Sequence, residues 1–565
     1  MLSLLPIFSL IIPTLAVPQV KLGNTVITGA SFLESGVEFF GGIPFAQPPV
    51  GELRLKPPVL ATVLDTPTFN ATKFGPSCLN TAFPKALVSE DCLQLNVFRP
   101  TNVTSNAKIP ILFWIYGGKP TSLCSNECLL ICYISGAFSA GATLKYNATS
   151  LVAQSMTRGT PIIVVSANYR LGPLGFPPTV EAAKKGSLNL GIKDQIAALK
   201  WVQNNIEIFG GDKSKVTIFG ESAGGNSVTL HFLGKHIKGL ARAAIAQSAP
   251  IVPSFLPGRY QDRWTSFISA IPECASLANS TNTFDCLRGN VTTASLLQGF
   301  AASTTDVRTD LTYFPTIDGP QGILPDLPTK LIPTARLPVI LGSNLDEGTF
   351  FIDQHVNSTE QISKQLTDLC KPALLGEKLL NNAMKQILRL YPDIPALGSP
   401  FNTGNQTFGL SSQYKRGAAI LGDWIFQAPR RAMSTSLREQ GIPVYGYQFT
   451  EPTAISPIAP DPRTVAPGSI AVTHGAEIPF VITGVTNGTA AAEALQIMMQ
   501  DYWISFAVTL NPNDGKGSNR PKWEEYSVSK PTVLQLQGGD VKAVPDTYRD
   551  AQMRFINSIP HVFHR

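Results

Sequence analysis

One short run, VTIFGESAGG at residues 216–225, constrains the possible fold more than any other stretch of this sequence. Its first four residues are β-branched or aromatic and predict a buried strand, and the residues after Ser222 are compatible with a helix. Gly220 and Gly224 relieve crowding around a serine held in a strained strand-to-helix turn. Such a turn presents its serine at the carboxyl edge of a sheet. The run therefore predicts an α/β fold with Ser222 as a nucleophile and the backbone N–H of Ala223 facing an oxyanion.

The rest of the chain alternates strand-like and helix-like stretches. Short apolar runs predict strands at residues 93–98, 109–116, 161–167, 243–246 and 337–341, and apolar residues at helical spacing predict a helix over 194–209. This alternation favours an α/β fold with a mostly parallel central sheet. No internal repeat or low-complexity linker is present, and the proline-rich residues 451–467 indicate a long surface loop. We therefore expect residues 17–565 to form a single catalytic unit with insertions.

A serine nucleophile needs a base, and strand–serine–helix turns of this kind take their partners in the chain order serine, acid, histidine. The chain has six histidines. His231 and His236 follow the turn too soon, His561 and His564 lie in the tail, and His355 precedes the expected position of the last partner. His474 is therefore the predicted base.

The acid should follow a strand between the serine and the histidine. Residues 342–348, GSNLDEG, come directly after the predicted strand at 337–341. Either Asp346 or Glu347 is placed to orient the imidazole and to stabilise its charged form.

The N-terminus and the composition predict a secreted protein. Residues 1–16 form an apolar stretch that ends in a small-residue cleavage pattern, which is typical of a signal peptide. No later segment has about 18 uninterrupted apolar residues, so no stable membrane insertion is expected. The formal charge of +6 without a basic run gives no indication of nucleic-acid binding. Glycosylation sequons stand at Asn70, Asn102, Asn147, Asn279, Asn290, Asn357, Asn405 and Asn487.

Eight cysteines suit an oxidising compartment. Cys78 and Cys92 flank one short loop and Cys274 and Cys286 another, so we predict these two disulfides, while Cys370 has no evident partner. Three more, Cys124, Cys128 and Cys132, fall within residues 119–136. No second ligand cluster follows them, so we predict no zinc site and no other metal.

Seven motifs together resemble the type-B carboxylesterase/lipase family, the cholinesterase-like branch of the α/β-hydrolases. They spread over nearly the whole mature chain: GIPFAQPPVG at 42–51, SEDCLQLN at 89–96, SANYRLG at 166–172, NLGIKDQ at 189–195, GESAGG at 220–225, DEG at 346–348 and HGAEIPF at 474–480. The composition and residues 501–512 look similar to fungal secreted members. The resemblance implies an α/β-hydrolase fold whose insertions form a gorge. It also implies Ser222 as nucleophile, Glu347 rather than Asp346 as acid, and His474 as base, and it supports both disulfide pairs.

The activity implied by the resemblance is ester hydrolysis through an acyl-enzyme, with small-molecule or lipid esters and water as reactants and no cofactor. The family's first disulfide loop can act as a lid. Here that loop has only thirteen residues, 79–91, which favours an esterase with an open gorge over an interfacially activated lipase. It also lacks tryptophan, which argues against choline esters. A second hypothesis is a catalytically impaired binding or adhesion protein, because several relatives of this family are non-catalytic.

The glycine turn that supplies the family's oxyanion hole is interrupted in this sequence. Gly118 and Ala137 would be adjacent in the usual spacing, but residues 119–136 separate them. Without these residues the turn reads YGGAFSAG and the family motifs continue in frame. We therefore interpret residues 119–136 as a retained intron; the alternative is a genuine cysteine-rich insertion. An oxyanion hole of Gly118, Ala137 and Ala223 would be impaired by the interruption, so we expect the chain as written to be a weak esterase or inactive.

Overall fold

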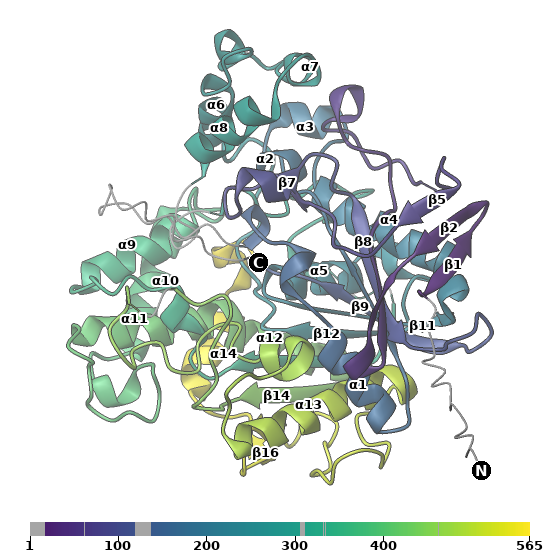
Figure 1. The fold of residues 1–565 in the computed structure, drawn as a ribbon. Coiled ribbons are helices and arrows are strands. Elements are labelled where there is room, and N and C mark those ends of the chain that lie inside the picture. The colour runs from purple at the N-terminus through teal and green to yellow at the C-terminus, as the bar shows by residue number, and fades with distance from the viewer. Residues whose placement is uncertain are drawn as a thin grey trace, which may run out of the picture.

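An eleven-stranded sheet forms the centre of the molecule (Figure 1). The computed structural model describes residues 17–61, 63–118, 137–304, 311–331, 333, 335–460 and 463–565. The predicted signal peptide (1–16) and residues 119–136, with Cys124, Cys128 and Cys132, lie outside the described residues.

The middle of the sheet is parallel and its edges are antiparallel. In spatial order the strands are β16 (Lys542–Pro545), β15 (Thr532–Leu536), β14 (Val444–Phe449), β13 (Val339–Asn344), β12 (Ala243–Gln247), β11 (Gly211–Glu221), β9 (Ile109–Ile115), β10 (Ile163–Ala167), β8 (Gln94–Pro100), β4 (Val37–Pro44) and β3 (Ala30–Phe32). All neighbours from β15 to β10 pair in parallel, and the other pairs are antiparallel. This arrangement confirms the predicted α/β class with a mostly parallel sheet.

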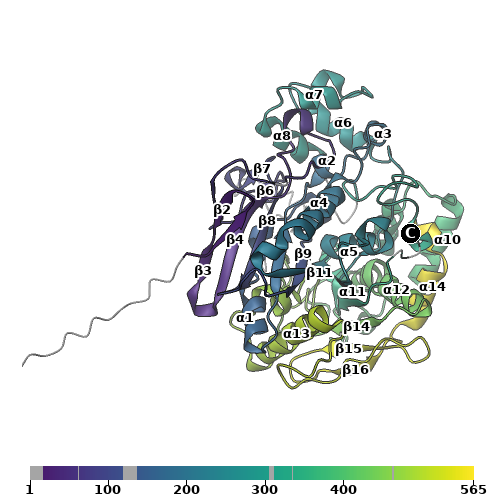
Figure 2. The same ribbon diagram turned by 90° about the vertical axis from the view of Figure 1, so that its right-hand side faces the viewer.

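Helices cover both faces of the sheet, which explains why its central strands are buried on both sides. α1 (Thr149–Thr157) and α13 (Ala490–Thr509) contact each other and the strands β8, β9 and β11. Figure 2 shows them on the opposite side of β9 and β11 from α4 (Leu190–Asn205) and α5 (Ala223–Leu233). α12 (Ala428–Glu439) packs on β13 and β14.

Two groups of shorter helices surround this core. One group forms the top of the molecule in Figure 1 and has a small hydrophobic core of its own: α3 (Val180–Lys184), α6 (Gln261–Ser269), α7 (Phe284–Arg288) and α8 (Thr293–Ser303). The other group lies on the left of the molecule in Figure 1: α9 (Thr359–Leu369), α10 (Glu377–Leu390), α11 (Ser412–Gly422) and α14 (Asp550–Ser558). A separate three-stranded sheet consists of β1 (Gln19–Leu22), β2 (Thr25–Thr28) and β5 (Thr68–Asn70).

Both predicted disulfides form, and the predicted glycosylation sites are exposed. Disulfides join Cys78 to Cys92 and Cys274 to Cys286, and Cys370 is buried as a free thiol. Each of the eight sequon asparagines is exposed. Among the described residues no helix has the length and apolar character needed to cross a bilayer.

Candidate active site

Ser222 stands between β11 and α5 in a conformation that few residues other than glycine adopt. Its φ of 57° and ψ of −122° mark a strained turn. Both positions next to Ser222 in this pattern require glycine for steric reasons. A Cβ on Gly220 would lie 2.6 Å from the carbonyl oxygen of Ile115, and a Cβ on Gly224 would lie only 1.9 Å from the same oxygen. The close packing of β9 against this turn therefore requires the glycine–serine–glycine pattern.

His474 contacts both predicted partners. Its Nε2 is 2.7 Å from Ser222 Oγ and its Nδ1 is 2.6 Å from a carboxylate oxygen of Glu347. The imidazole is buried and packs against the rings of Phe350, Phe351 and Phe426. Three elements far apart in the sequence thus meet around one imidazole.

The two candidate acids have different surroundings. Glu347 follows β13 and is fully buried; its other oxygen accepts hydrogen bonds from Ser248 Oγ (2.6 Å) and the Asn344 backbone N–H (2.7 Å). Asp346 instead accepts hydrogen bonds from Ser399 Oγ and the Phe401 N–H, so it braces neighbouring loops. Burial raises the pKa of Asp346 to about 6. Of the two acids, Glu347 is the one beside His474.

Two further buried glutamates, Glu221 and Glu477, lie next to the Ser222–His474–Glu347 group. A carboxyl oxygen of Glu221 approaches His474 Nε2 to 3.3 Å without a hydrogen bond, since that nitrogen already faces Ser222. Glu477 accepts a hydrogen bond from Asn344 Nδ2. Burial, reinforced by the neighbouring carboxylates, raises the pKa of Glu221 well above its usual value and also raises that of Glu477.

The rise in the pKa of Glu221 favours its neutral form, and neither of its carboxyl oxygens accepts a hydrogen bond. The sequence analysis did not single out this residue. A charged side chain between a buried strand and the nucleophile was the available signal for it.

The predicted oxyanion residues lie around Ser222. Ala223 begins α5, and Gly118, Ala137 and Ala223 all line the cavity that contains Ser222 and His474. The segments on either side of residues 119–136 are in close contact, because a Cβ on Gly141 would lie 2.7 Å from the carbonyl oxygen of Gly117. Ala137 has a φ of 54°, an unusual value for alanine. The separation of Gly118 from Ala137 in sequence thus does not keep them from lining one cavity.

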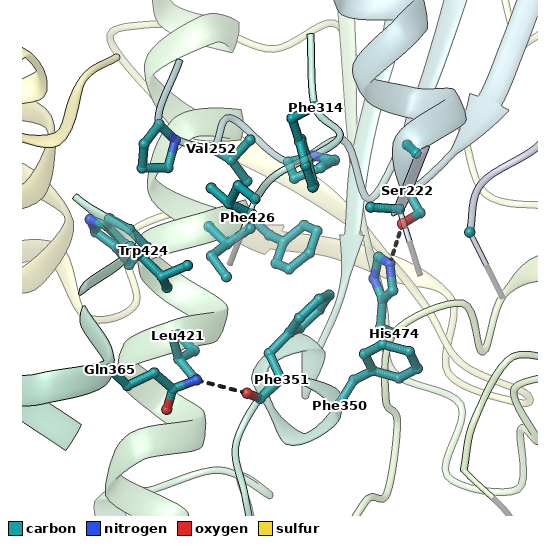
Figure 3. Close-up of a pocket in the computed structure, with 18 residues that line it drawn as sticks. Ser222, Val252, Phe314, Phe350, Phe351, Gln365, Leu421, Trp424, Phe426 and His474 are labelled. Carbon is teal, nitrogen blue, oxygen red and sulfur yellow. Dashed lines mark hydrogen bonds between the residues drawn. The ribbon is translucent and has the colours of Figure 1, made fainter. Parts of the chain in front are cut away.

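The cavity beyond the serine is strongly apolar (Figure 3). Ser222 and His474 lie at one end in Figure 3, and Trp424 and Gln365 lie at the other. Gln365 Nε2 donates a hydrogen bond to the carbonyl oxygen of Phe351. Most remaining lining residues are aliphatic or aromatic, among them Val252, Leu311, Phe314, Phe350, Leu421 and Phe426. Such a surface favours an apolar ligand group next to the serine.

A π-helical turn, η12 (Asp423–Gln427), supplies one wall of this cavity through Trp424, Ile425 and Phe426. π-turns within helices are frequent at functional sites because they displace the side chains that follow. Asp423 anchors the turn, since its carboxylate binds the Arg549 guanidinium at 2.6 Å and the hydroxyl of Tyr391 at 2.7 Å. These two contacts of Asp423 fix the position of the turn that carries the wall.

Comparison with known proteins identifies the class of enzyme. The family model described as "Carboxylesterase family" matches residues 16–556, so the chain belongs to this family. Secreted lipase 1 of Botryotinia fuckeliana (strain B05.10) is 32% identical to it, with 98% of each chain aligned. Lipase 2 of Geotrichum candidum is also 32% identical, with 93% of this chain and 92% of that protein aligned.

A solved structure agrees with the sequence comparisons. The crystal structure of Aspergillus niger EstA matches with a TM-score of 0.80 and 25% identity, covering 97% of this chain and 99% of that one. The predicted α/β-hydrolase fold is thereby confirmed. Family membership over nearly the full length makes this protein a carboxylic ester hydrolase.

Proposed function

We propose that the protein hydrolyses esters through a Ser222–His474–Glu347 triad and an acyl-enzyme, with fatty-acyl or other lipid esters as its substrates. The observation that carries the proposal is the buried imidazole of His474, which lies within hydrogen-bond distance of both Ser222 Oγ and Glu347. This is the geometry that general-base activation of a serine requires.

In the first half-reaction, Ser222 Oγ attacks the ester carbonyl while His474 Nε2 takes its proton. Glu347 stabilises the resulting imidazolium through Nδ1 and is itself held by two hydrogen bonds. The tetrahedral oxyanion accepts hydrogen bonds from the backbone N–H groups of Gly118, Ala137 and Ala223. His474 then protonates the leaving alcohol, and the acyl group remains on Ser222.

In the second half-reaction, water replaces the alcohol. His474 removes a proton from the water while the water oxygen attacks the acyl carbonyl. As the second tetrahedral intermediate collapses, His474 returns that proton to Ser222 Oγ, which releases the acid and restores both residues. These steps require no metal or organic cofactor.

The substrate class is supported by the apolar cavity and by the relatives, which are named as lipases. None of residues 79–91, the loop closed by the Cys78–Cys92 disulfide, lines the cavity. A loop that stays clear of the cavity supports an open approach to Ser222 rather than a lid-gated one.

Secretion is the proposed setting. It is supported by the signal-like residues 1–16, by the two disulfides, by eight exposed sequons and by relatives named as secreted lipases. We also propose that residues 119–136 are a retained intron; a mature transcript containing their codons would contradict this.

A covalent serine probe tests the catalytic assignment. A fluorophosphonate should label the wild type on Ser222, and neither Ser222→Ala nor a denatured sample should react. Hydrolysis of p-nitrophenyl butyrate and palmitate, measured on the same samples, should follow the labelling. Folded wild type that does not label would contradict the triad and favour the binding-protein hypothesis.

A further inference from the structure

The last residue of β13, Asn344, contacts both the acid and the loop of the base in the proposed triad. Its backbone N–H donates a hydrogen bond to Glu347 at 2.7 Å, and its side-chain Nδ2 donates to the carbonyl oxygen of Thr473 at 2.9 Å. Thr473 directly precedes His474 in the sequence. A shift of this one buried residue would therefore change the position of the acid relative to the base.

Asn344 extends beyond the part of the sheet where β12 and β13 pair. That pairing ends with Gln247 opposite Gly342, two residues earlier on β13. On the other side of the strand, the Leu345 N–H still donates to the Phe449 carbonyl of β14. Because main-chain groups alternate between the two neighbouring strands, those of Asn344 face the side where β12 has ended. They are buried there and need hydrogen-bond partners from side chains.

The side-chain amide of Gln427, the last residue of η12, supplies the donor that the Asn344 carbonyl needs. Its Nε2 donates to the Asn344 carbonyl oxygen at 2.8 Å, and its Oε1 accepts from the hydroxyls of Ser343 at 2.7 Å and Tyr548 at 2.6 Å. The carbonyl oxygen can only accept a hydrogen bond, so the nitrogen of the amide must face it. All three bonds of this buried amide are therefore specific to its orientation.

η12 thereby connects the cavity wall with the proposed triad. Phe426 lines the cavity, and its ring packs on the His474 imidazole with 4.9 Å between the ring centroids. The next side chain, Gln427, holds the end of β13 instead. A glutamine that only braced a helix on the sheet could bond any free main-chain group, whereas this one bonds the residue that contacts Glu347 and the His474 loop.

We propose that Gln427 is a positioning residue of the reaction, which holds Asn344 and, through it, the Glu347 carboxylate against His474. The inference rests on the proposed triad. Without the amide, the buried Asn344 carbonyl loses its donor, and the strand end shifts because an unpaired buried acceptor is costly. Glu347 acts on the chemical step through His474, so the shift should lower kcat and leave KM unchanged.

The test compares two variants and a matched control in the full-length protein. Gln427→Asn withdraws the amide from Asn344 by one methylene, and Gln427→Met fills the original space without a donor, so either variant is informative if the other does not fold. Each should lower kcat for p-nitrophenyl butyrate and palmitate by the same factor, roughly tenfold to hundredfold, with KM unchanged. Fluorophosphonate labelling of Ser222 should slow in parallel.

Tyr548→Phe is the control, because it removes another bond of the same amide but leaves the one to Asn344. Its kcat should stay within about twofold of the wild-type value. An equal loss of kcat in Tyr548→Phe would reduce Gln427 to a structural brace and overturn the proposal. A changed palmitate-to-butyrate ratio with an unchanged kcat for butyrate would also overturn it, because Gln427 would then act on the cavity wall.

A double-mutant cycle shows whether Gln427 acts through Glu347. In the Glu347→Gln background the carboxylate is already lost, so a Gln427 substitution should lower kcat by less than a further factor of about two. Losses that multiply in the double variant would refute the inference while leaving the triad intact. A Glu347→Gln variant that keeps full activity on its own would instead overturn the triad, so the two failures are distinguishable.

Discussion

Deletion of residues 119–136 is the perturbation that tests the oxyanion turn. The structure packs both flanks of this segment on the nucleophile: a Cβ on Gly117 would lie 2.7 Å from Ser222 Cβ, and Gly118 and Ala137 line the cavity of Ser222. Deletion joins Gly118 directly to Ala137, so one peptide plane fixes both residues. In the full-length chain Ala137 must hold a φ of 54° without that restraint. We expect the shortened protein to be the better esterase.

Two terms set the magnitude. Closing an excursion of eighteen residues between Gly118 and Ala137 costs roughly 2.5 kcal/mol of chain entropy. Misorientation of the Ala137 N–H removes one oxyanion donor, which costs about 2.7–4 kcal/mol of transition-state stabilisation. Only the second term acts on the chemical step, so kcat for the shortened enzyme should exceed that of the full chain by roughly 10²–10³-fold. The first term should appear as a higher Tm.

The assay compares the two forms with p-nitrophenyl butyrate. The concentration of competent sites is fixed by fluorophosphonate titration, so that misfolded protein does not count toward kcat. The shortened form carrying Ser222→Ala supplies the background rate. Equal kcat for the two titrated enzymes would refute the reasoning, because it would mean that the interrupted turn already presents all its donors.

Three further changes test the charges and the shape of the site. Glu347→Gln should lower kcat by roughly 10²–10⁴-fold, as loss of the orienting carboxylate does in serine triads. Asp346→Asn removes a side chain that braces neighbouring loops, so it should lower Tm with a far smaller loss of kcat. Equal losses of kcat in the two variants would contradict the choice of Glu347. Burial raises the pKa of Glu221, so the folded protein keeps a proton that the unfolded chain releases above about pH 4.5, and stability falls as the pH rises from there. Glu221→Gln should therefore flatten the decline of Tm between pH 4.5 and 7, and an unchanged slope would contradict the buried neutral acid. Phe351→Ala enlarges the cavity beside His474 and should raise the palmitate-to-butyrate ratio of kcat/KM; an unaltered ratio would show that this ring does not limit the acyl chain.

The central sheet was predictable because its signals are local. Residues 163–167 and 243–247 form strands where the apolar runs predicted them, and α4 followed by η6 (Ile206–Phe209) covers the whole of the predicted helix over 194–209. The predicted strand at 216–219 extends in the structure over Gly211–Glu221. Its charged first half gave no apolar signal, and pairing with β9 determines where it starts. The antiparallel pairs at the edges of the sheet were not predictable either, because no local sequence pattern identifies the pairing partner of an edge strand.

The Ser222–His474–Glu347 group was predictable for a different reason. Chain order and the scarcity of histidine reduced the choice of base to one residue, and the acid to two neighbours. The choice between Asp346 and Glu347 needs three-dimensional information, because the loops that contain Ser399 and Val472 bind Asp346 and turn it away from the imidazole.

The charge state of the site is the property that is least predictable from the sequence. Glu221, Glu347 and Glu477 are spread over more than 250 positions of the chain, and nothing local marks them as neighbours. Once the fold buries them side by side, the charges of Glu477 and Glu347 add to the effect of burial and raise the pKa of Glu221, since like charges at short range and low dielectric repel strongly. Hydrogen bonding distinguishes two of them: Glu347 accepts from Ser248 and Asn344 and lies 2.6 Å from His474 Nδ1, whereas both oxygens of Glu221 accept none. A carboxylate needs hydrogen-bond donors, so Glu221, which has none, is the acid whose neutral form the site favours.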